Sequence, residues 1–223
     1  MRIDKKHKID TIYRLLSGHY EDLGWWPADS PFEVMVGAVL TQNTAWTNVE
    51  KAIANLKDKA LLDPGKMLAA DPAELGALIR PAGYFNTKSR SLRNICRFYM
   101  EELSGEPASR AGLSTEELRS RLLNVRGVGP ETADSILLYA LHRPVCVVDA
   151  YTRRIFSRHG IVPEGAGYET VQRAIHDVIS PDVMVYNRYH AMLVETAKRF
   201  CSKKKPLCDD CPLKALGKGG CQP

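Results

Sequence analysis

Apolar residues recur along the chain at intervals of three and four residues, the spacing expected of amphipathic helices. Ile9, Ile12, Leu15 and Leu16 predict an opening helix, and no stretch shows the strict alternation of a strand. The segment 31–40, PFEVMVGAVL, begins with proline, which suits the first turn of a helix, and is apolar almost all round. We therefore predict an all-α fold in which this segment is a central buried helix.

The same spacing predicts helices through the rest of the chain. Residues 86–103 form a long basic helix, and Ser114 and Glu117 have the spacing of a capping box. Another helix opens at Asp149 and stops at Gly160, a residue that often follows the end of a helix. The last predicted helix runs directly into a group of cysteines.

A glycine-rich turn joins two of these helices in the segment 122–140, LLNVRGVGPETADSILLYA. The two glycines can expose backbone N–H groups, and the following helix adds the positive end of its dipole, so the turn suits a phosphate group. Val128 is expected to point into the helix pair as a hydrophobic pin. The predicted phosphate contacts are Gly127, Val128, Gly129, Glu131 and Thr132 in the turn, and Lys88 in the basic helix. An ordinary helix–helix turn and a solvated basic face are the alternatives.

Composition is compatible with this interpretation without requiring it. The chain has 223 residues, 44% of them hydrophobic, and a formal net charge of +5. A mildly basic protein can bind a polyanion, although many basic proteins bind none. The charged first ten residues lack the apolar core of a signal peptide, and no apolar run is long enough to span a bilayer. We expect no membrane partner and a cytoplasmic, nucleoid-associated protein of a bacterium or archaeon.

Four of the six cysteines lie close together near the C-terminus: Cys201, Cys208, Cys211 and Cys221. Four thiolates in one short loop suit a tetrahedral ligand set, and both zinc and a [4Fe–4S] cluster are held in this way. In a reducing compartment such a group favours a metal over disulfides. Cys96 and Cys146 lie in helical or apolar contexts and are predicted to be buried thiols.

Together, the glycine turn, the segment VVDAYTRRI and the terminal cysteines resemble the endonuclease III, or helix-hairpin-helix-GPD, superfamily of DNA glycosylases. The resemblance covers roughly residues 28 to 221. It implies two helical lobes: a barrel of residues 28–140 ending in the helix-hairpin-helix, and a discontinuous lobe of residues 1–27 and 141–223 bearing the cysteine loop. It also favours [4Fe–4S] over zinc, although the final gap of nine residues is longer than the usual pattern.

Two positions of this resemblance concern the chemistry. Bifunctional members of the superfamily carry a catalytic lysine where this chain has Glu131, whereas their downstream aspartate matches Asp149. A β-lyase step needs an amine to form a Schiff base with the sugar, and a carboxylate cannot form one. The resemblance therefore implies a monofunctional glycosylase in which Asp149 is the catalytic carboxylate. Asp149 can also cap a helix, and the two roles are compatible.

Within the superfamily, the chain resembles the 3-methyladenine DNA glycosylase group through its segments GWWPADSPFEVMVGAVLTQNTAW and IRPAGYFNTKSRSL. The adenine-mismatch branch is disfavoured, because Ala38 replaces its catalytic glutamate. The resemblance places the base pocket at Trp26, Pro27, Gln42, Asn43 and Trp46. A flipped cationic purine would lie between Trp46 and either Trp25 or Trp26, since an indole face attracts a cation.

The leading hypothesis is a DNA N-glycosylase of base excision repair that removes alkylated purines, 3-methyladenine and also 7-methylguanine, from double-stranded DNA. We expect it to act as a monomer. Ala150, after the aspartate, and the presence of the cysteine loop depart from some members of the group, which leaves the choice of lesion open. Two alternatives stay open: a glycosylase for uracil or thymine opposite guanine, and a non-catalytic protein that binds damaged DNA.

Overall fold

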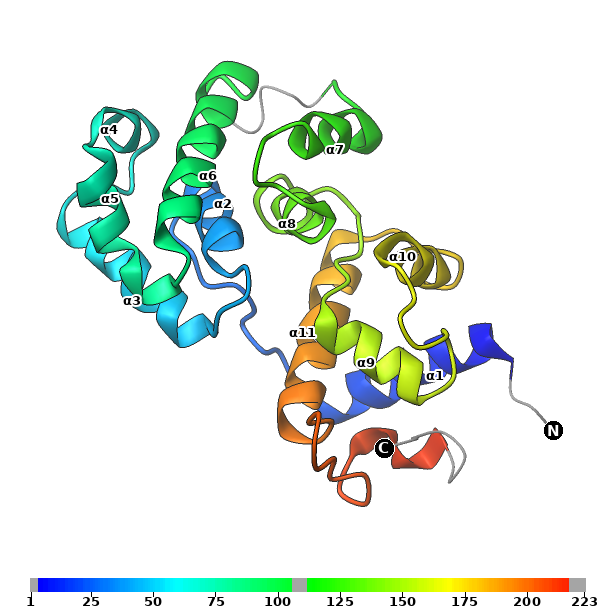
Figure 1. Cartoon of the computed structure of the whole chain (residues 1–223). Helices are drawn as coiled ribbons and strands as arrows, with labels where there is room; N and C mark the ends of the chain where they lie inside the picture. Colours follow the sequence, from blue (N-terminus) through cyan, green and yellow to red (C-terminus); the bar gives the residue numbers. More distant parts are fainter. Residues whose placement is uncertain (1–3, 106–111, 217–223) are drawn as a thin grey trace. The chain divides into compact units, whose positions relative to one another are not determined.

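The computed structural model describes residues 4–105 and 112–216, and the regular structure in these ranges is helical throughout (Figure 1). The chain divides into two compact units. Unit 1 contains the described residues up to Trp25 and those from Pro144 onward, and unit 2 contains those from Trp26 to Arg143. The all-α prediction is therefore confirmed. In the described ranges no helix is long and apolar enough to cross a membrane.

Unit 2 is built around a helix that is buried along almost its whole length. Its elements are α2 (Pro31–Leu40), α3 (Trp46–Asp58), α4 (Pro64–Ala69), α5 (Pro72–Leu78), the 3-10 turn η1 (Arg80–Ala82), α6 (Phe85–Arg97), the π-helical turn η2 (Phe98–Glu102), α7 (Thr115–Leu123), α8 (Pro130–Ser135) and the π-helical turn η4 (Ile136–Ala140). The central helix α2 packs against α3, α6, α8 and η4. Its nine residues from Phe32 to Leu40 are all buried, as the run of apolar residues predicts.

Several helices of unit 2 begin at residues whose side chains cap the free amides of the first turn. Ser30 accepts from the amide of Glu33, and Asp71 accepts from the amides of Ala73 and Glu74. At α7 the predicted capping box is present, with Ser114 and Glu117 each bonding the other's backbone amide. These local bonds explain where the helices start, because the first four N–H groups of a helix otherwise lack partners.

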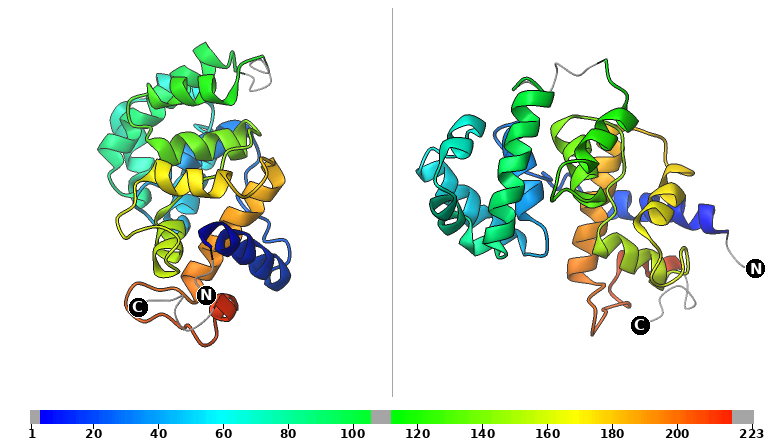
Figure 2. Two further views of the ribbon diagram at one scale, coloured as in Figure 1. Left: turned by 90° about the vertical axis from the view of Figure 1, so that its right-hand side faces the viewer. Right: turned by 45° about the horizontal axis from the view of Figure 1, so that its top comes forward.

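Unit 1 contains the two ends of the described chain. Its elements are α1 (Lys5–His19), α9 (Ala150–Arg158), α10 (Tyr168–His176), α11 (Val183–Arg199) and the 3-10 turn η5 (Pro212–Leu216). Helix α11 packs against α9 and α1, and η5 packs against α1 (Figure 2). Tyr186 and Tyr189 of α11 are almost fully buried in this core, together with Phe156 of α9.

Candidate functional site

The glycine turn between α7 and α8 needs a glycine at its first position. Gly127 has a φ of +97°, and a Cβ atom there would lie 2.1 Å from Oγ and 2.8 Å from Cβ of Ser91. Gly129 has an ordinary φ of −99° and nothing within 4 Å of the corresponding point. Val128 is 7% exposed, which confirms its prediction as a hydrophobic pin. At Gly127 the hairpin therefore lies so close to α6 that no residue larger than glycine fits.

Gln42 connects this hairpin to the turn after α2. Its Nε2 donates to the carbonyl oxygen of Gly127 at 3.0 Å and to Oγ1 of Thr132 at 2.9 Å. Gln42 was assigned to the base pocket and Thr132 to the phosphate contacts, and the structure brings the two side chains together. The turn expected to face a flipped nucleotide is thus bonded directly to the turn expected to hold the backbone.

A buried ion pair joins the two helices of the hairpin. Asp134 of α8 is fully buried, and Arg119 of α7 bonds its two carboxylate oxygens at 2.7 and 3.2 Å. On the other side of the turn, Asn94 of α6 donates to the carbonyl oxygen of Arg126 at 2.9 Å. Glu131 is exposed in the first turn of α8, where a negative charge suits the helix dipole.

The structure contradicts a phosphate contact by Lys88. Its side chain is 2% exposed, and its ammonium donates to the carbonyl oxygens of Leu40 and Ala82, each at 2.8 Å. Burial lowers the pKa of Lys88 to about 8. The basic character of this helix suggested a solvated side chain, but at this position the lysine is directed into the unit. It fixes the end of α2 to the turn that precedes α6.

That second turn carries an exposed aromatic residue to which the sequence analysis gave no role. Tyr84 is 72% exposed and has a φ of +47°, directly after Gly83 with a φ of +71°. A left-handed backbone at a bulky residue is uncommon and often marks a functional turn. The glycine that precedes an aromatic residue in PAGYF is the sequence signal that could have indicated this turn.

Trp26 and Trp46 of the predicted base pocket belong to the same unit, whereas Trp25, the alternative wall, belongs to the other. Trp25 lies in unit 1, where it contacts His190 edge to face at 5.7 Å, and this supports a structural role. Trp26 lies in unit 2, stacked on Tyr139 at 4.8 Å and edge to face with Trp46 at 5.3 Å. Gly37 lies against the indole of Trp26, and a Cβ atom there would be 3.5 Å from Nε1 of that ring, an ordinary van der Waals contact.

This cluster of Trp26, Trp46 and Tyr139 is closed. The two indoles have centroids 5.3 Å apart and planes at 65°, which leaves no room for a third ring between them. Nε1 of Trp46 donates to Glu50 at 3.0 Å, which holds the Trp46 ring in this position. Tyr139 was not predicted, because its position in an apolar helix gave no sign of a partner. Pro27 and Asn43 are exposed close to these residues in sequence.

Asp149 caps α9 in unit 1. Its Oδ1 accepts from the amide of Thr152 at 2.7 Å, and its Oδ2 lies 3.7 Å from Nε2 of His190 on α11. Burial by itself raises the pKa of this carboxyl, but the nearby imidazole of His190 and the hydrogen bond from the amide of Thr152 outweigh it, so the pKa lies below its usual value. Asp149 is therefore a carboxylate at neutral pH although it is 8% exposed.

Three of the four cysteines of the terminal group lie within the described residues. Cys201 and Cys211 are buried, Cys208 is half-buried, and Cys221 lies outside the described residues. Sγ of Cys201 accepts from Arg158 of α9 at 3.1 Å, and Sγ of Cys211 accepts from the amide of Leu213 at 3.5 Å. N–H donors to sulfur suit ligand thiolates. In the described ranges no three Cys, His, Asp or Glu side chains converge on one metal position. Cys96 and Cys146 are fully buried, as predicted.

Comparisons with known proteins agree with this arrangement. Residues 36–181 match the model of the HhH-GPD superfamily base excision DNA repair protein. A protein of Methanocaldococcus jannaschii, provisionally named a DNA repair glycosylase, is 47% identical over 96% of this chain and 97% of its own. Endonuclease III of Thermotoga maritima is 32% identical over 82% of this chain and 81% of its own.

A solved structure shows the same fold. The 3-methyladenine DNA glycosylase of H. pylori, bound to 1,N6-ethenoadenine, superimposes with a TM-score of 0.74 and 26% identity. The match covers 88% of this chain and 98% of that protein.

Proposed function

The chain belongs to the HhH-GPD superfamily of base excision DNA repair proteins and is a DNA glycosylase, and we propose that it removes alkylated purines by hydrolysis, without a lyase step. The observation that carries this proposal is the pair of carboxylates at the two key positions. Asp149 is a buried carboxylate capping α9, and Glu131 stands where a lyase would need an amine. The products are then a free base and an abasic site.

Asp149 has the chemistry that hydrolysis of an N-glycosidic bond requires. As the base departs, positive charge develops on the sugar, and a nearby carboxylate stabilises this charge and orients or deprotonates the attacking water. The lowered pKa keeps Asp149 ionised for this role. No amine is required, and Lys88, the lysine assigned to DNA contact, is bonded to two backbone carbonyls.

The aromatic cluster of unit 2 is the proposed base-recognition element. A purine alkylated at N3 or N7 is cationic, so it leaves without protonation and is attracted to an indole face. Because the cluster is closed, we propose that the Trp46 ring turns away from Trp26 to admit a base, which breaks its bond to Glu50. The similarity to a 3-methyladenine glycosylase that holds an ethenoadenine base supports this substrate class.

Contacts with the DNA backbone are proposed for the hairpin residues Gly127, Val128, Gly129, Glu131 and Thr132, which lie at the N-terminal end of α8. Tyr84 is proposed as an additional contact with the bases, since an exposed aromatic side chain can stack on any of them. We further propose that Cys201, Cys208, Cys211 and Cys221 hold a [4Fe–4S] cluster, with zinc as the alternative. Such a group would fix the terminal loop and supply no step of the hydrolysis.

Release of bases from methylated double-stranded DNA, resolved by base, tests the proposal. Asp149→Asn is the decisive variant, because asparagine also caps helices well and so preserves the fold. We expect 3-methyladenine release by the wild type, a loss of about 10²–10⁴-fold in Asp149→Asn, and no adduct with borohydride. Release of uracil or thymine opposite guanine instead would favour the alternative substrate. DNA binding with equal inactivity of both proteins on every lesion would favour a non-catalytic role.

The metal is tested separately from the base release. A brown preparation that contains four iron and four sulfide ions per chain would support the [4Fe–4S] cluster. A colourless preparation, purified without oxygen and containing one zinc ion per chain, would support zinc.

A further inference from the structure

The segment that leads into Asp149 has an unusual environment for its backbone. Residues 144–149 have no regular secondary structure and lie between η4 and α9 in the chain, and Val145, Cys146, Val147 and Val148 are at most 4% exposed. Buried N–H and C=O groups need hydrogen-bond partners, which an extended segment normally obtains from a neighbouring strand. In the described ranges of this chain no segment is a β-strand.

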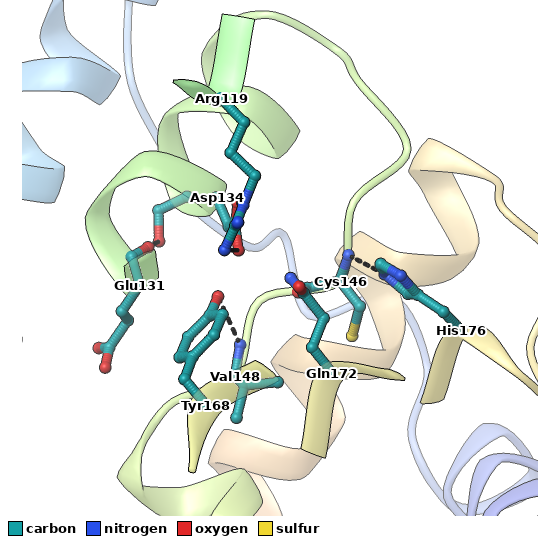
Figure 3. A network of polar contacts seen from close by, with 9 residues as sticks. Arg119, Glu131, Asp134, Cys146, Val148, Tyr168, Gln172 and His176 are labelled. Carbon is teal, nitrogen blue, oxygen red and sulfur yellow. Dashed lines mark hydrogen bonds and ion pairs between the residues drawn. The ribbon is translucent and has the colours of Figure 1, made fainter. Parts of the chain in front are cut away.

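Side chains of α10 provide partners instead. Nε2 of His176 accepts from the amide of Cys146 at 3.0 Å, and Nε2 of Gln172 donates to the carbonyl oxygen of Cys146 at 2.7 Å. The hydroxyl of Tyr168 accepts from the amide of Val148 at 3.3 Å. Figure 3 shows all three side chains directed from α10 towards this segment.

The spacing of these three residues makes the arrangement possible. Tyr168, Gln172 and His176 are four residues apart, so they lie on one face of the helix, one turn above the next. Each turn of α10 therefore presents one polar group to the segment. We call these three residues the α10 ladder.

The last backbone group that the α10 ladder bonds is the amide of Val148, one residue before Asp149. The bond from the amide of Thr152 and the nearby imidazole of His190 orient the carboxylate of Asp149, and its carbonyl oxygen accepts from the amide of Arg153 at 3.1 Å within α9. The backbone on the N-terminal side of Asp149 depends on other contacts. Val148 and Cys146 are fixed by the ladder. A backbone shift at Val148 would displace Asp149 directly, and a misplacement of about 1 Å can cost about 10²-fold in rate.

We propose that Tyr168, Gln172 and His176 are positioning residues for Asp149, acting through the backbone of Cys146 and Val148. This inference rests on the proposed catalytic role of Asp149. None of the three side chains needs to touch the substrate. The backbone of the segment PVCVVD is thus bonded by side chains of α10 rather than by a neighbouring strand.

The variants Tyr168→Phe, Gln172→Leu and His176→Leu each remove a different bond of the α10 ladder, and Tyr168→Phe does so with the loss of a single oxygen. We expect each to slow single-turnover base release by about 10–100-fold, with the Kd for DNA within twofold of the wild type. His176→Gln should recover most of the rate, since its amide oxygen can accept from Cys146. Thr170→Ala and Arg173→Gln, at exposed positions of the same helix, are the controls and should keep the wild-type rate.

A double variant separates positioning from general stability. If the ladder acts through Asp149, adding Tyr168→Phe to Asp149→Asn causes no further loss of rate, since the group being positioned is already gone. A further loss equal to that in the wild-type background would overturn the inference. So would wild-type rates in all three single variants while Asp149→Asn is inactive, and that result would leave the proposed function intact. Full activity of Asp149→Asn would instead remove the proposed function and the inference with it.

A substrate-independent measurement covers the case in which no lesion is found. Amide hydrogen exchange in Tyr168→Phe should accelerate at Val148, and the amide resonance of Thr152 should shift, because this amide bonds Asp149 directly. An unchanged Thr152 resonance would show that Asp149 has not moved, and this too would overturn the inference.

Discussion

The hairpin of unit 2 and the Asp149 segment of unit 1 are held in place in different ways. The hairpin takes its shape from a local sequence, since Gly127 adopts a φ that favours glycine and Val128 pins the turn to the interior. The Asp149 segment has no such local device. Its backbone is held by side chains about 20 to 30 residues further along the chain. A short motif can therefore specify the turn that is proposed to bind DNA, whereas the placement of the proposed catalytic carboxylate depends on the assembled unit.

The largest expected effect tests the local character of the hairpin. Gly127→Ala should lower the free energy of unfolding by about 4 kcal/mol, combining a left-handed backbone with a clash against Ser91. DNA binding should weaken as well, because the turn must move. Gly129→Ala is the matched control for stability, and urea unfolding should find it close to the wild type. Equal effects at the two glycines would show that the shape of the turn is not the reason for glycine.

Much of the structure of unit 2 could be predicted from the sequence. The capping box, the buried α2, the pin at Val128 and the buried thiol of Cys96 all follow from neighbouring residues or from apolar runs. The buried position of Lys88 could not be predicted, because a basic helix pattern does not reveal that one lysine is directed inward to two carbonyl oxygens. Tyr139 and the closed state of the indoles also escaped prediction, since they depend on how α2, α3 and η4 pack.

Around Asp149 less could be predicted. Its capping role follows from the residue type, and the family resemblance indicates its catalytic role. His190 and the α10 ladder carry no motif, since ordinary polar residues at a spacing of four usually mark a solvated helix face. Only the fold places Gln172 in the interior, where it is 6% exposed.

The next prediction concerns the ion pair between Arg119 and Asp134, which joins the two helices of the hairpin. Arg119→Met leaves the carboxylate of Asp134 buried without this partner and should cost about 3 kcal/mol of stability. Arg121→Met, two residues along the same helix, breaks an exposed pair with Glu102 and should cost less than about 1 kcal/mol. Thermal unfolding of both variants measures the difference. If the two losses are the same, the hairpin does not depend on the buried pair.

The helix that Asp149 opens should be sensitive to acid. Burial, together with the charge of Lys8, lowers the pKa of His159 at the end of α9 from 6.5 to about 4. Above pH 6.5 the imidazole is neutral in both states, but between pH 6.5 and about 4 the unfolded chain binds the proton first. Stability therefore falls as the pH falls, by about 2 kcal/mol at pH 5.

Urea unfolding at pH 7 and pH 5 checks this expectation. His159→Gln should lose the part of the acid sensitivity that this histidine contributes, whereas His7→Gln, at an exposed position of α1, should retain it. A variant at His159 with the full pH dependence of the wild type would place the acid-sensitive group elsewhere in the protein.

The smallest expected effect lies in unit 2 and at alkaline pH. Burial lowers the pKa of Lys88 from 10.5 to about 8. Between these values the folded chain releases its proton before the unfolded chain does, so stability rises with pH, by about 1 kcal/mol from pH 7 to pH 9. Lys88→Met should lose this rise, and Lys51→Met, exposed on α3, should keep it. The two units are thus expected to respond differently to pH. Acid lowers the stability of unit 1, which carries Asp149, and alkali raises the stability of unit 2, which carries the hairpin. A flat difference between wild type and Lys88→Met across this range would mean that the two carbonyl oxygens compensate fully for burial of the ammonium.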